Sequence, residues 1–388
     1  MLKASTGSSV LPQAFDAGKE AAAEIKSELK SVKAAFVYAS CAYDLDEMVK
    51  GIRSELPGVP FVGNTSFTGV ITPKGFVTGD QGFIGIMGLE DDAMCIGVAS
   101  AVKTDSAVKA GREAAEKALK AAGTTTAPDY FYMTAPPGEE EYYLKGISEI
   151  IGRVPFFGGS AADNSIAGEW KLFTDEGVFE NGVAVMFVYS DKPVTNYFTG
   201  AYHETKDAGV ITKVDGDRTL VEIDGVPALD KYAEWRGIDR NSILGMNLLV
   251  STITSPLGVK DRIGDLVAIR HPMNGNEDGS MNIGNKLAVG TAVIRMEASV
   301  DELIDSAGAG VSALLEKSQA PLGAMLLVHC GGRRAGIGDR IEEVAEGIRK
   351  AAGDVPYLVE FTFGEYGYES DDRNTCGGLM LSFTGFAR

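Results

Sequence analysis

The chain has 388 residues, 45% of them hydrophobic, and carries a formal net charge of −18 at pH 7. This length favours two or three domains or one large repeated architecture, and the charge repels nucleic acid and anionic membrane surfaces. No window reaches the ~18 uninterrupted apolar residues of a membrane span, and residues 1–15 lack the apolar core of a signal peptide. We therefore expect a cytoplasmic protein that binds neither nucleic acid nor membrane.

The cysteine and histidine content bears on metal and redox chemistry. The four cysteines include no CxxC pair, and in a chain of this kind we expect reduced thiols. The three histidines, His203, His271 and His329, are too few for a histidine-rich metal site. No ligand spacing supports a mixed site, so the sequence predicts neither a metal nor a cofactor.

Three segments of the chain share one pattern. In each, a Gly-Ile pair precedes a Val-Pro pair, with eight residues from Gly to Val, beginning at Gly51, Gly146 and Gly347. Short apolar runs lie upstream and downstream of each pair; they cover residues 35–38, 130–133 and 325–328, then 82–88, 182–189 and 378–383. The runs predict buried strands, and the segments between them predict helices that end before the proline. Each copy is therefore predicted to form a parallel βαβ step.

A different region, at about residues 192–320, separates the second and third copies. The runs 209–216 and 219–225 meet at an Asp-Gly turn and predict a hairpin. Pro227 is expected to begin a short helix, and Ser299 with Glu302 forms a capping-box pattern before a longer one. The whole pattern predicts an α/β fold with mixed β-sheets and flanking helices. Three βαβ-plus-hairpin units would stack in helix–sheet–sheet–helix layers.

Several further pieces of the sequence form a pattern in their order along the chain; they are residues 154–163, 182–185, 210–214, 221–228, 329–333, 364–366 and 374–375. Together these pieces resemble the FIST family of tandem FIST-N and FIST-C domains. The resemblance implies a FIST-N-like domain with two repeat units at 1–190. It also implies a FIST-C-like domain at 191–388, which holds the hairpin region and the third unit. At the end of the pattern the family tends to have Gly-Glu-Ile, where this chain has Gly364-Glu365-Tyr366.

The resemblance also implies a function. FIST domains are sensory domains of signal transduction that are thought to bind small ligands such as amino acids or related metabolites, and no catalysis is associated with them. No receiver, kinase or methyl-accepting segment is recognisable here, so we expect output through a signalling protein partner or an oligomer. A homodimer is the default expectation.

The first candidate site is the strand-to-helix loop at residues 330–339. Its glycines let backbone N–H groups approach a ligand, a helix N-terminus follows, and arginine binds carboxylate or phosphate in bidentate fashion. The functional interpretation is a cradle for an anionic metabolite, and the alternative is an ordinary turn whose arginines pair with surface carboxylates. The candidate ligand-binding residues are Cys330, Gly331, Gly332, Arg333 and Arg334.

A second candidate loop follows the strand of the second copy, where ligands of parallel sheets bind. It offers small residues, a hydroxyl, a carboxylate and an amide, which suit a polar small molecule. The alternative is a turn that satisfies its own backbone. The candidate residues are Gly158, Gly159, Ser160, Asp163 and Asn164.

The third copy adds Gly364, Glu365 and Asn374 to the candidates. Glu365 can receive a ligand amine or pair with Arg333 or Arg334. Asn374 can form a hydrogen bond with Glu365 or with a ligand, or it can simply stabilise a turn.

Two patterns in the third copy resemble catalytic or cofactor motifs. Cys330 follows His329, but neighbours on a strand point to opposite faces, so a core or ligand-lining thiol is favoured over a nucleophile. The glycines of residues 308–313 half-match a dinucleotide fingerprint, but they lie in a predicted helix, where helix packing explains them better. The sequence thus favours a small-ligand sensor without a catalytic residue. The alternatives are an enzyme using Cys330 or Glu365 and a scaffold protein without a ligand.

Overall fold

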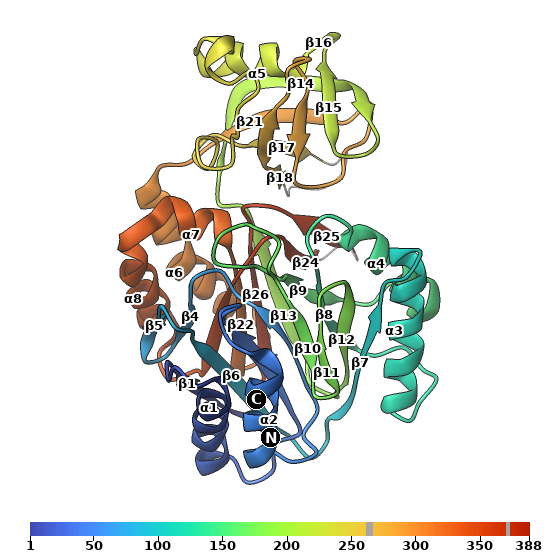
Figure 1. Cartoon of the computed structure of the whole chain (residues 1–388), viewed down its shortest axis with the longest axis vertical. Coiled ribbons are helices and arrows are strands. Elements are labelled where there is room, and N and C mark those ends of the chain that lie inside the picture. The colour runs from blue at the N-terminus through green and yellow to red at the C-terminus, as the bar shows by residue number, and fades with distance from the viewer. Residues whose placement is uncertain (261–266, 370–372) are drawn as a thin grey trace.

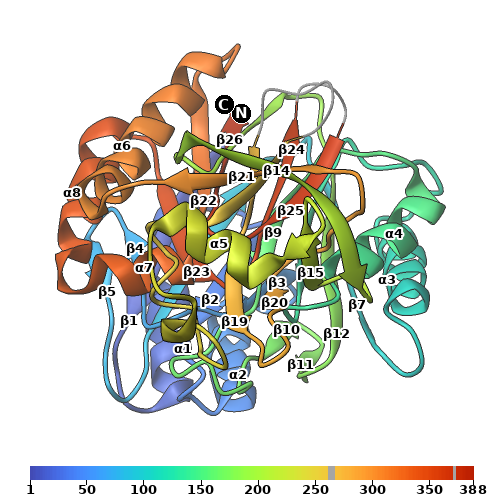
Figure 2. The same cartoon turned by 90° about the horizontal axis from the view of Figure 1, so that it is seen from above.

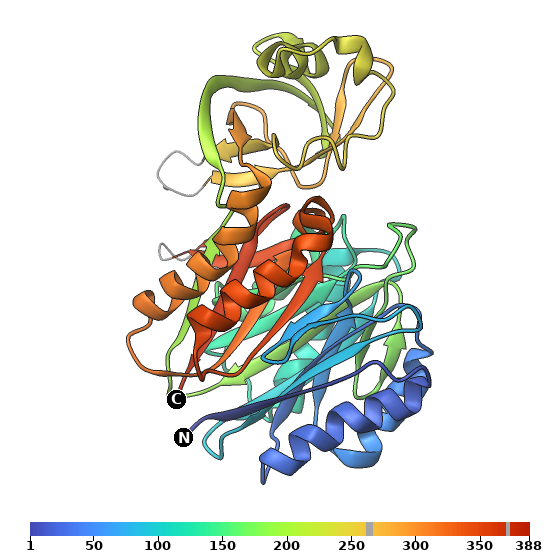
Figure 3. The ribbon, with the colours of Figure 1, turned by 90° about the vertical axis from the view of Figure 1, so that its left-hand side faces the viewer.

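The computed structural model describes residues 1–260, 267–369 and 373–388. A body of three similar units carries a smaller, β-rich insert at one end, and the two termini lie side by side at the opposite end (Figures 1 and 3). No helix within the described residues is long and apolar enough to cross a membrane.

Each unit of the body runs strand, helix, strand, helix, strand, hairpin, strand. The first unit consists of β1 (Lys3–Ser9), α1 (Ala14–Glu28), β2 (Ala34–Ala39), α2 (Leu45–Glu55), β3 (Phe61–Thr65), the hairpin β4 (Val70–Thr72) and β5 (Gly75–Val77), and β6 (Ile84–Glu90). The second consists of β7 (Cys95–Val102), α3 (Ala107–Ala121), β8 (Tyr130–Ala135), α4 (Glu140–Ile151), β9 (Phe156–Ser160), the hairpin β10 (Leu172–Thr174) and β11 (Gly177–Phe179), and β12 (Gly182–Tyr189).

The third unit has the same order with two additions, the insert after its first strand and a short helix, α7, after its second. It consists of β13 (Val194–Thr199), α6 (Val300–Lys317), β22 (Leu322–Cys330), α7 (Gly331–Ile337), α8 (Ile341–Ala352), β23 (Tyr357–Thr362), the hairpin β24 (Glu365–Glu369) and β25 (Arg373–Gly377), and β26 (Leu381–Ala387). A single 3-10 turn (Gly338–Arg340) separates α7 from α8. The capping box predicted at Ser299 and Glu302 is present at the start of α6.

The sheets of the three units are mixed and share one strand order. In the first unit β2 and β3 pair in parallel, and β6 and β1 add to β2 antiparallel, which gives the order β1-β6-β2-β3. The other two units repeat it as β7-β12-β8-β9 and β13-β26-β22-β23. The predicted α/β class with mixed sheets and the three βαβ steps are confirmed.

The hairpins of the units are exchanged in a ring. The hairpin of the second unit pairs through β10 with β3 of the first, that of the third pairs through β24 with β9 of the second, and that of the first pairs through β4 with β23 of the third. Every sheet therefore borrows its last two strands from a neighbouring unit. Because each borrowed hairpin crosses a unit boundary, the three units fold as one body.

The inner faces of the three sheets enclose one shared apolar core. Phe36 of β2, Tyr132 of β8 and Leu326 of β22 belong to this core, while a pair of helices covers the outer face of each sheet. A section through any two units gives the expected helix–sheet–sheet–helix order, and the third unit closes the remaining side. Three sheets with one bare face each can bury those faces together only around a common centre.

The glycines of the repeat pattern allow close helix pairing. A Cβ on Gly51 of α2 would lie 2.0 Å from the carbonyl oxygen of Phe15 in α1, and one on Gly146 of α4 would lie 2.0 Å from that of Val108 in α3. In the third unit a Cβ on Gly308 of α6 would approach the carbonyl oxygen of Gly347 to 2.9 Å. The helix-packing interpretation thus holds for Gly308, whereas a Cβ on Gly310 would lie 2.8 Å from the Phe383 ring of the sheet.

The insert, residues 200–299, occupies the connection from the first strand to the first helix of the third unit. In the other two units four residues make this connection, 10–13 and 103–106. Its elements are β14 (His203–Asp215), β15 (Thr219–Ile223), β16 (Val226–Pro227), α5 (Ala228–Arg236), a 3-10 turn (Arg240–Ser242), β17 (Leu257–Lys260), β18 (Val267–Arg270), β19 (Pro272–Gly275), β20 (Met281–Ile283) and β21 (Ala292–Glu297). The predicted hairpin is β14–β15, and seen from above the insert covers the strand ends of the body (Figure 2).

Candidate functional site

A cavity of about 410 Å³ lies where the carboxyl end of β22 meets the insert. The third unit contributes Cys330, Gly331, Gly332, Ala335, Phe363, Gly378 and Leu379. The second unit contributes Pro137, Gly138, Ile166 and Trp170, and the insert contributes Arg218, Leu249, Val250, Ile253, His271, Met273, Ile283, Gly284 and Asn285. Most of these side chains are apolar, with a few polar groups among them, as in sites for small molecules.

The predicted strand-to-helix loop forms one wall of this cavity as the short helix α7. Cys330 caps the helix, since its Sγ accepts a hydrogen bond from the Gly332 N–H at 3.2 Å. A Cβ on Gly331 would lie 3.1 Å from the Phe363 ring, and one on Gly332 would lie 2.8 Å from Leu379 Cδ2. The glycines of this loop therefore keep the helix close to its neighbours, and three of the predicted residues line the cavity.

Arg333 turns away from the cavity and is fully buried. Its guanidinium donates to the carbonyl oxygens of Gly200 at 2.7 Å, Leu303 at 3.2 Å and Leu379 at 3.4 Å, and to the hydroxyl of Ser306. These partners lie where the insert begins, in α6 and beside the cavity. Arg333 therefore ties α7 to the root of the insert.

Arg334 is likewise engaged by the protein. Its Nη1 donates to the carbonyl oxygen of Gly338 at 2.8 Å, and its guanidinium lies 5.0 Å from the centre of the Phe76 ring. The expected anion cradle needs guanidinium groups that face a ligand, and neither Arg333 nor Arg334 lines the cavity. The anion-cradle interpretation of this loop is therefore replaced by an apolar wall held by buried hydrogen bonds.

The second predicted loop connects two sheets at its start. A Cβ on Gly158 would lie 2.0 Å from the carbonyl oxygen of Met133, and one on Gly159 would lie 2.5 Å from Thr362 Cγ2. The Ser160 N–H donates to the carbonyl oxygen of Gly364 at 2.7 Å, and the Ser160 hydroxyl lies 2.7 Å from that of Tyr366. These residues join β9 to the borrowed hairpin and do not line the cavity.

Asp163 and Asn164 shape the segment that follows. The Asp163 carboxylate accepts the backbone N–H groups of residues 165–169, a turn of the kind weighed as the alternative. Asn164 Oδ1 accepts the Thr68 N–H at 3.0 Å, and its Nδ2 donates to Ser40 Oγ at 3.2 Å. The segment held in this way presents Ile166 and Trp170 to the cavity. Trp170 also meets the Phe363 ring edge-on at 6.3 Å.

Glu365 is a buried carboxyl behind the cavity wall. It accepts from the Thr362 hydroxyl at 2.9 Å and from the Met380 N–H at 2.8 Å, and burial raises its pKa to about 8. It forms no ion pair with Arg333 or Arg334 among the described contacts. Asn374 donates instead to the carbonyl oxygen of Val154 at 2.9 Å. Hence Glu365 and Asn374 are held by the body rather than exposed to the cavity.

Cys330 and the two histidines near it, His329 and His271, are all buried. The Cys330 side chain lines the cavity, yet the residue is 4% exposed, and burial raises the pKa of its thiol far above the ordinary value. The His329 ring lies on the other side of the strand against Phe361, and burial lowers its pKa to about 3. His271 in the cavity wall has its Nε2 at 2.9 Å from the Leu249 carbonyl oxygen, and burial lowers its pKa to about 4.

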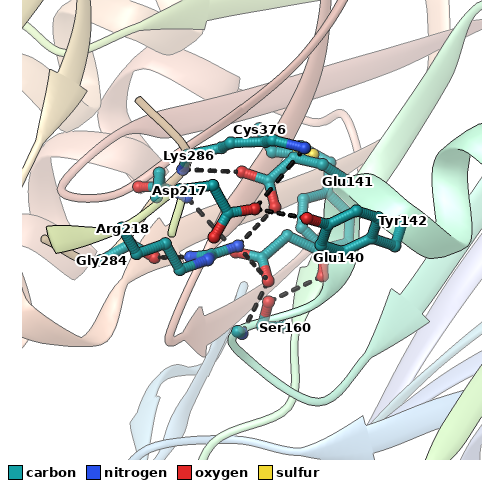
Figure 4. Close-up of polar contacts among 12 residues, drawn as sticks. Glu140, Glu141, Tyr142, Ser160, Asp217, Arg218, Gly284, Lys286 and Cys376 are labelled. Carbon is teal, nitrogen blue, oxygen red and sulfur yellow. Dashed lines mark hydrogen bonds and ion pairs between the residues drawn. The ribbon is translucent and has the colours of Figure 1, made fainter. Parts of the chain in front are cut away.

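The polar end of the cavity is made of residues that the sequence did not single out. Arg218, in the turn between β14 and β15, lies between the carboxylates of Glu140 (3.4 Å) and Glu141 and donates to the carbonyl oxygen of Gly284 (Figure 4). Asn285 Nδ2 donates to Glu140 Oε1 at 3.3 Å. Burial raises the pKa of Glu140 to about 7, and the Glu141 charge adds to the rise, while Arg218 opposes it.

Tyr142 of α4 makes a second polar contact with the insert, at an ion pair that lies within the insert. Lys286 Nζ lies 3.5 Å from Asp217 Oδ2 and 4.3 Å from the centre of the Tyr142 ring, and the Tyr142 hydroxyl donates to Asp217 (Figure 4). Within the described residues no group of three or more His, Cys, Asp or Glu side chains is placed to hold a metal ion.

Family models match most of the chain. The FIST N domain matches residues 33–226, and the FIST C domain matches residues 228–368. The chain belongs to the FIST family. FIST domains are sensory domains of signal transduction. The two matches meet at residue 227, inside the insert, so the insert is shared between the N-domain and C-domain patterns of the FIST family.

Solved structures show only a distant likeness to this FIST protein, and no curated protein matches it. A cyanuric acid hydrolase from A. caulinodans is 10% identical, with a TM-score of 0.39, and each chain covers 100% of the other. PurLQS and phosphoribosylformylglycinamidine synthase II, both from Thermotoga maritima, are each 10% identical, with TM-scores of 0.23 and 0.24; the matches cover 100% of this chain and 73% and 72% of theirs. Such TM-scores carry no argument about function.

Proposed function

We propose that this FIST protein is a sensor that binds a compact, mainly apolar small molecule in the cavity between α7 and the insert. The observation that carries the proposal is the cavity itself. Its walls come from the second unit, the third unit and the insert, so a bound molecule would contact all three. A ligand at such a junction favours the arrangement in which the insert is closed onto the body.

The apolar lining supports this class of ligand. Trp170, Phe363 and Leu379 form a continuous apolar wall, and Ile166 and Val250 stand at the mouth with large exposed fractions of 50% and 71%. Exposed apolar side chains at the mouth of an apolar cavity gain free energy when a ligand covers them.

The family resemblance implied a ligand such as an amino acid, and the two arginines in the loop at 330–339 favoured an anionic one. Arg333 and Arg334 are engaged by the protein, and the cation at the cavity, Arg218, already faces two carboxylates. The charge argument for an anion therefore no longer supports this ligand class.

We also propose that the site binds without catalysis. Cys330 is a buried thiol with a raised pKa, and the thiolate is the nucleophilic form. Among the described contacts neither histidine reaches the Cys330 sulfur: His329 Nδ1 lies 3.0 Å from the Cys330 backbone carbonyl oxygen, and His271 Nε2 lies 2.9 Å from that of Leu249. Output through a signalling partner or a second copy of the chain remains part of the proposal, with the insert as the element that a ligand would fix.

The test uses prodan, an uncharged fluorescent probe whose emission rises in apolar surroundings. Ala335 lines the cavity from an exposed position on α7, so Ala335→Trp should fill the entrance without disturbing the core. Ala121→Trp, at the exposed end of α3, is the matched control. We expect saturable binding by the wild type and Ala121→Trp and at least about a tenfold loss in Ala335→Trp. Equal binding by all three proteins, or none by the wild type, would contradict the proposal.

A further inference from the structure

Two residues of the insert form what we call the polar edge of the cavity, Arg218 and Asn285. Both line the cavity, and both are fixed from behind by Glu140, which lies 3.4 Å from Arg218 Nη2 and accepts from Asn285 Nδ2 at 3.3 Å. Arg218 Nη1 also donates to the carbonyl oxygen of Gly284, the residue before Asn285. The guanidinium and the amide are therefore neighbours with set orientations.

One polar atom on each of these side chains is left unpaired. Asn285 Oδ1, an acceptor, and Arg218 Nε, a donor, are buried and have no hydrogen-bond partner among the described residues. Asn285 as a whole is 2% exposed. Buried polar groups are nearly always paired, and an unpaired one in a native protein points to a missing partner. Here the two unpaired atoms belong to residues that line a cavity, which a ligand can enter.

Gly378 has no side chain that would block the unpaired Asn285 Oδ1. Gly378 lines the cavity, and a Cβ on it would lie 3.1 Å from Asn285 Oδ1 and 3.6 Å from His271 Cβ. Any side chain at this position would therefore cover the oxygen. Glycine leaves that space open to a ligand atom that comes within hydrogen-bond distance of Oδ1.

The charge around the polar edge disfavours an anion. Arg218 faces the carboxylates of Glu140 and Glu141, Arg270 interacts electrostatically with the same two carboxylates, and Lys286 is paired with Asp217. The three cations are thus matched by three carboxylates. An incoming carboxylate would find no unmatched positive charge and would lose its hydration in a partly buried setting.

We infer that the ligand presents an uncharged hydrogen-bonding edge to the cavity, with a donor for Asn285 Oδ1 next to an acceptor for Arg218 Nε, as a carboxamide does. The inference deepens the proposed function and rests on it. Asn285 and Arg218 then determine specificity, while the apolar wall binds the body of the ligand.

The experiment compares three molecules with the same ring and different heads as competitors of prodan: benzamide, benzoate and toluene. Benzamide offers both the donor and the acceptor, benzoate offers only acceptors and a negative charge, and toluene offers neither. We expect benzamide to displace prodan at roughly a tenth of the concentration that either of the others requires, since each new hydrogen bond contributes a few-fold to about tenfold.

Two variants assign the preference to the polar edge. Gly378→Ala covers Asn285 Oδ1 without removing a polar group and should lower the preference for benzamide over toluene to under about threefold. Gly347→Ala, in α8 and outside the cavity, is the control that should keep it, because the atoms nearest to its added Cβ are 3.9 Å away. Asn285→Leu should abolish the preference and serves as a second variant.

The outcomes separate the two proposals. If benzoate displaces prodan most strongly, or if benzamide displaces it no better than toluene, the inference is overturned and the proposed function stands. Preservation of the benzamide preference in both Gly378→Ala and Asn285→Leu would also overturn it. Failure of prodan to bind would overturn the proposed function, and the inference with it.

Discussion

The third unit and the first two are built on the same strand order, but they differ at the ends of their strands. In the first two units short connections lead from strand to helix, while the third has the insert of residues 200–299 and the extra helix α7. The cavity lies between these two additions. The repeated parts therefore form the body, and the departures from the repeat form the candidate site.

The three units also differ at equivalent positions in the centre of the body. The strand registers make Asn64, Gly159 and Glu360 equivalent positions on β3, β9 and β23. Only the third unit places a carboxyl there, and it accepts from Asn64 Nδ2 at 2.8 Å and from the Tyr132 hydroxyl at 3.3 Å. The duplicated units have thus diverged both at the site and in the shared core.

The largest loss of stability is expected when Arg333 is removed, because this side chain joins α7 to the root of the insert. Arg333→Ala should lower the free energy of unfolding by about 3–5 kcal/mol, because it leaves three buried carbonyl oxygens without their donor and opens a cavity. Arg334→Ala, at a half-buried position, should cost less than about 1 kcal/mol. Urea denaturation measures both, and equal effects would contradict the assigned roles.

A second contrast concerns the helix pairs of the units. Gly146→Ala forces a Cβ to within 2.0 Å of a carbonyl oxygen in α3 and should destabilise the protein by about 1–3 kcal/mol. Gly347→Ala is the equivalent change in the third unit, where the nearest atoms are 3.9 Å away. It should be neutral or stabilising by up to about 1 kcal/mol, since alanine favours helix. Thermal unfolding of both variants checks the difference, and the reverse order would refute it.

The carboxyl at the centre of the body predicts a dependence of stability on pH. Burial raises the pKa of Glu360 to about 8, against about 4.3 in an unfolded chain. The folded state therefore binds this proton more tightly, and the resulting stabilisation is present at low pH and is lost as the pH rises through about 8. Glu360→Gln should reduce the loss of stability between pH 5 and pH 9 by on the order of 4 kcal/mol.

Denaturation curves at several pH values make this measurement. Glu140 and Glu365 also have raised pKa values, so part of the pH dependence should remain in the variant. An unchanged pH profile in Glu360→Gln would show that this carboxyl does not titrate as described.

The smallest expected effect is a difference in thiol reactivity between corresponding loops. Cys41 follows β2 in the first unit and is partly exposed, while Cys330 ends β22 in the third and is buried. Iodoacetamide should modify exposed Cys95 first, then Cys41, and should leave Cys330 and Cys376 largely intact in the native state. Mass spectrometry of timed samples checks the order, and rapid labelling of Cys330 would favour the enzyme alternative.

The sequence was sufficient for the features that depend on local pattern. The βαβ steps, the β14–β15 hairpin and the capping box at Ser299 follow from periodicity and turn chemistry, and each is present. Three of the predicted residues, Cys330, Gly331 and Gly332, line the cavity, because strand ends are where such cavities form.

The features that depend on distant partners were not predictable in the same way. The exchanged hairpins pair through strands of only three to five residues, which carry no signal of their partner. Arg218 and Asn285 are single polar residues in turns, and they acquire a role only because Glu140 of α4 lies against them. From the sequence, Arg333 was expected to bind an anion. Its actual partners are carbonyl groups of three separate segments, and no local pattern shows that these segments meet around it.

The central claim is that one ligand contacts the second unit, the third unit and the insert at once. Hydrogen–deuterium exchange of the whole chain, with and without saturating prodan, tests it most directly. We predict slower exchange in three separate segments, around residues 166–170, 283–286 and 331–335, and unchanged exchange in α1 and α3. Protection confined to one of these segments, or located elsewhere, would contradict the account.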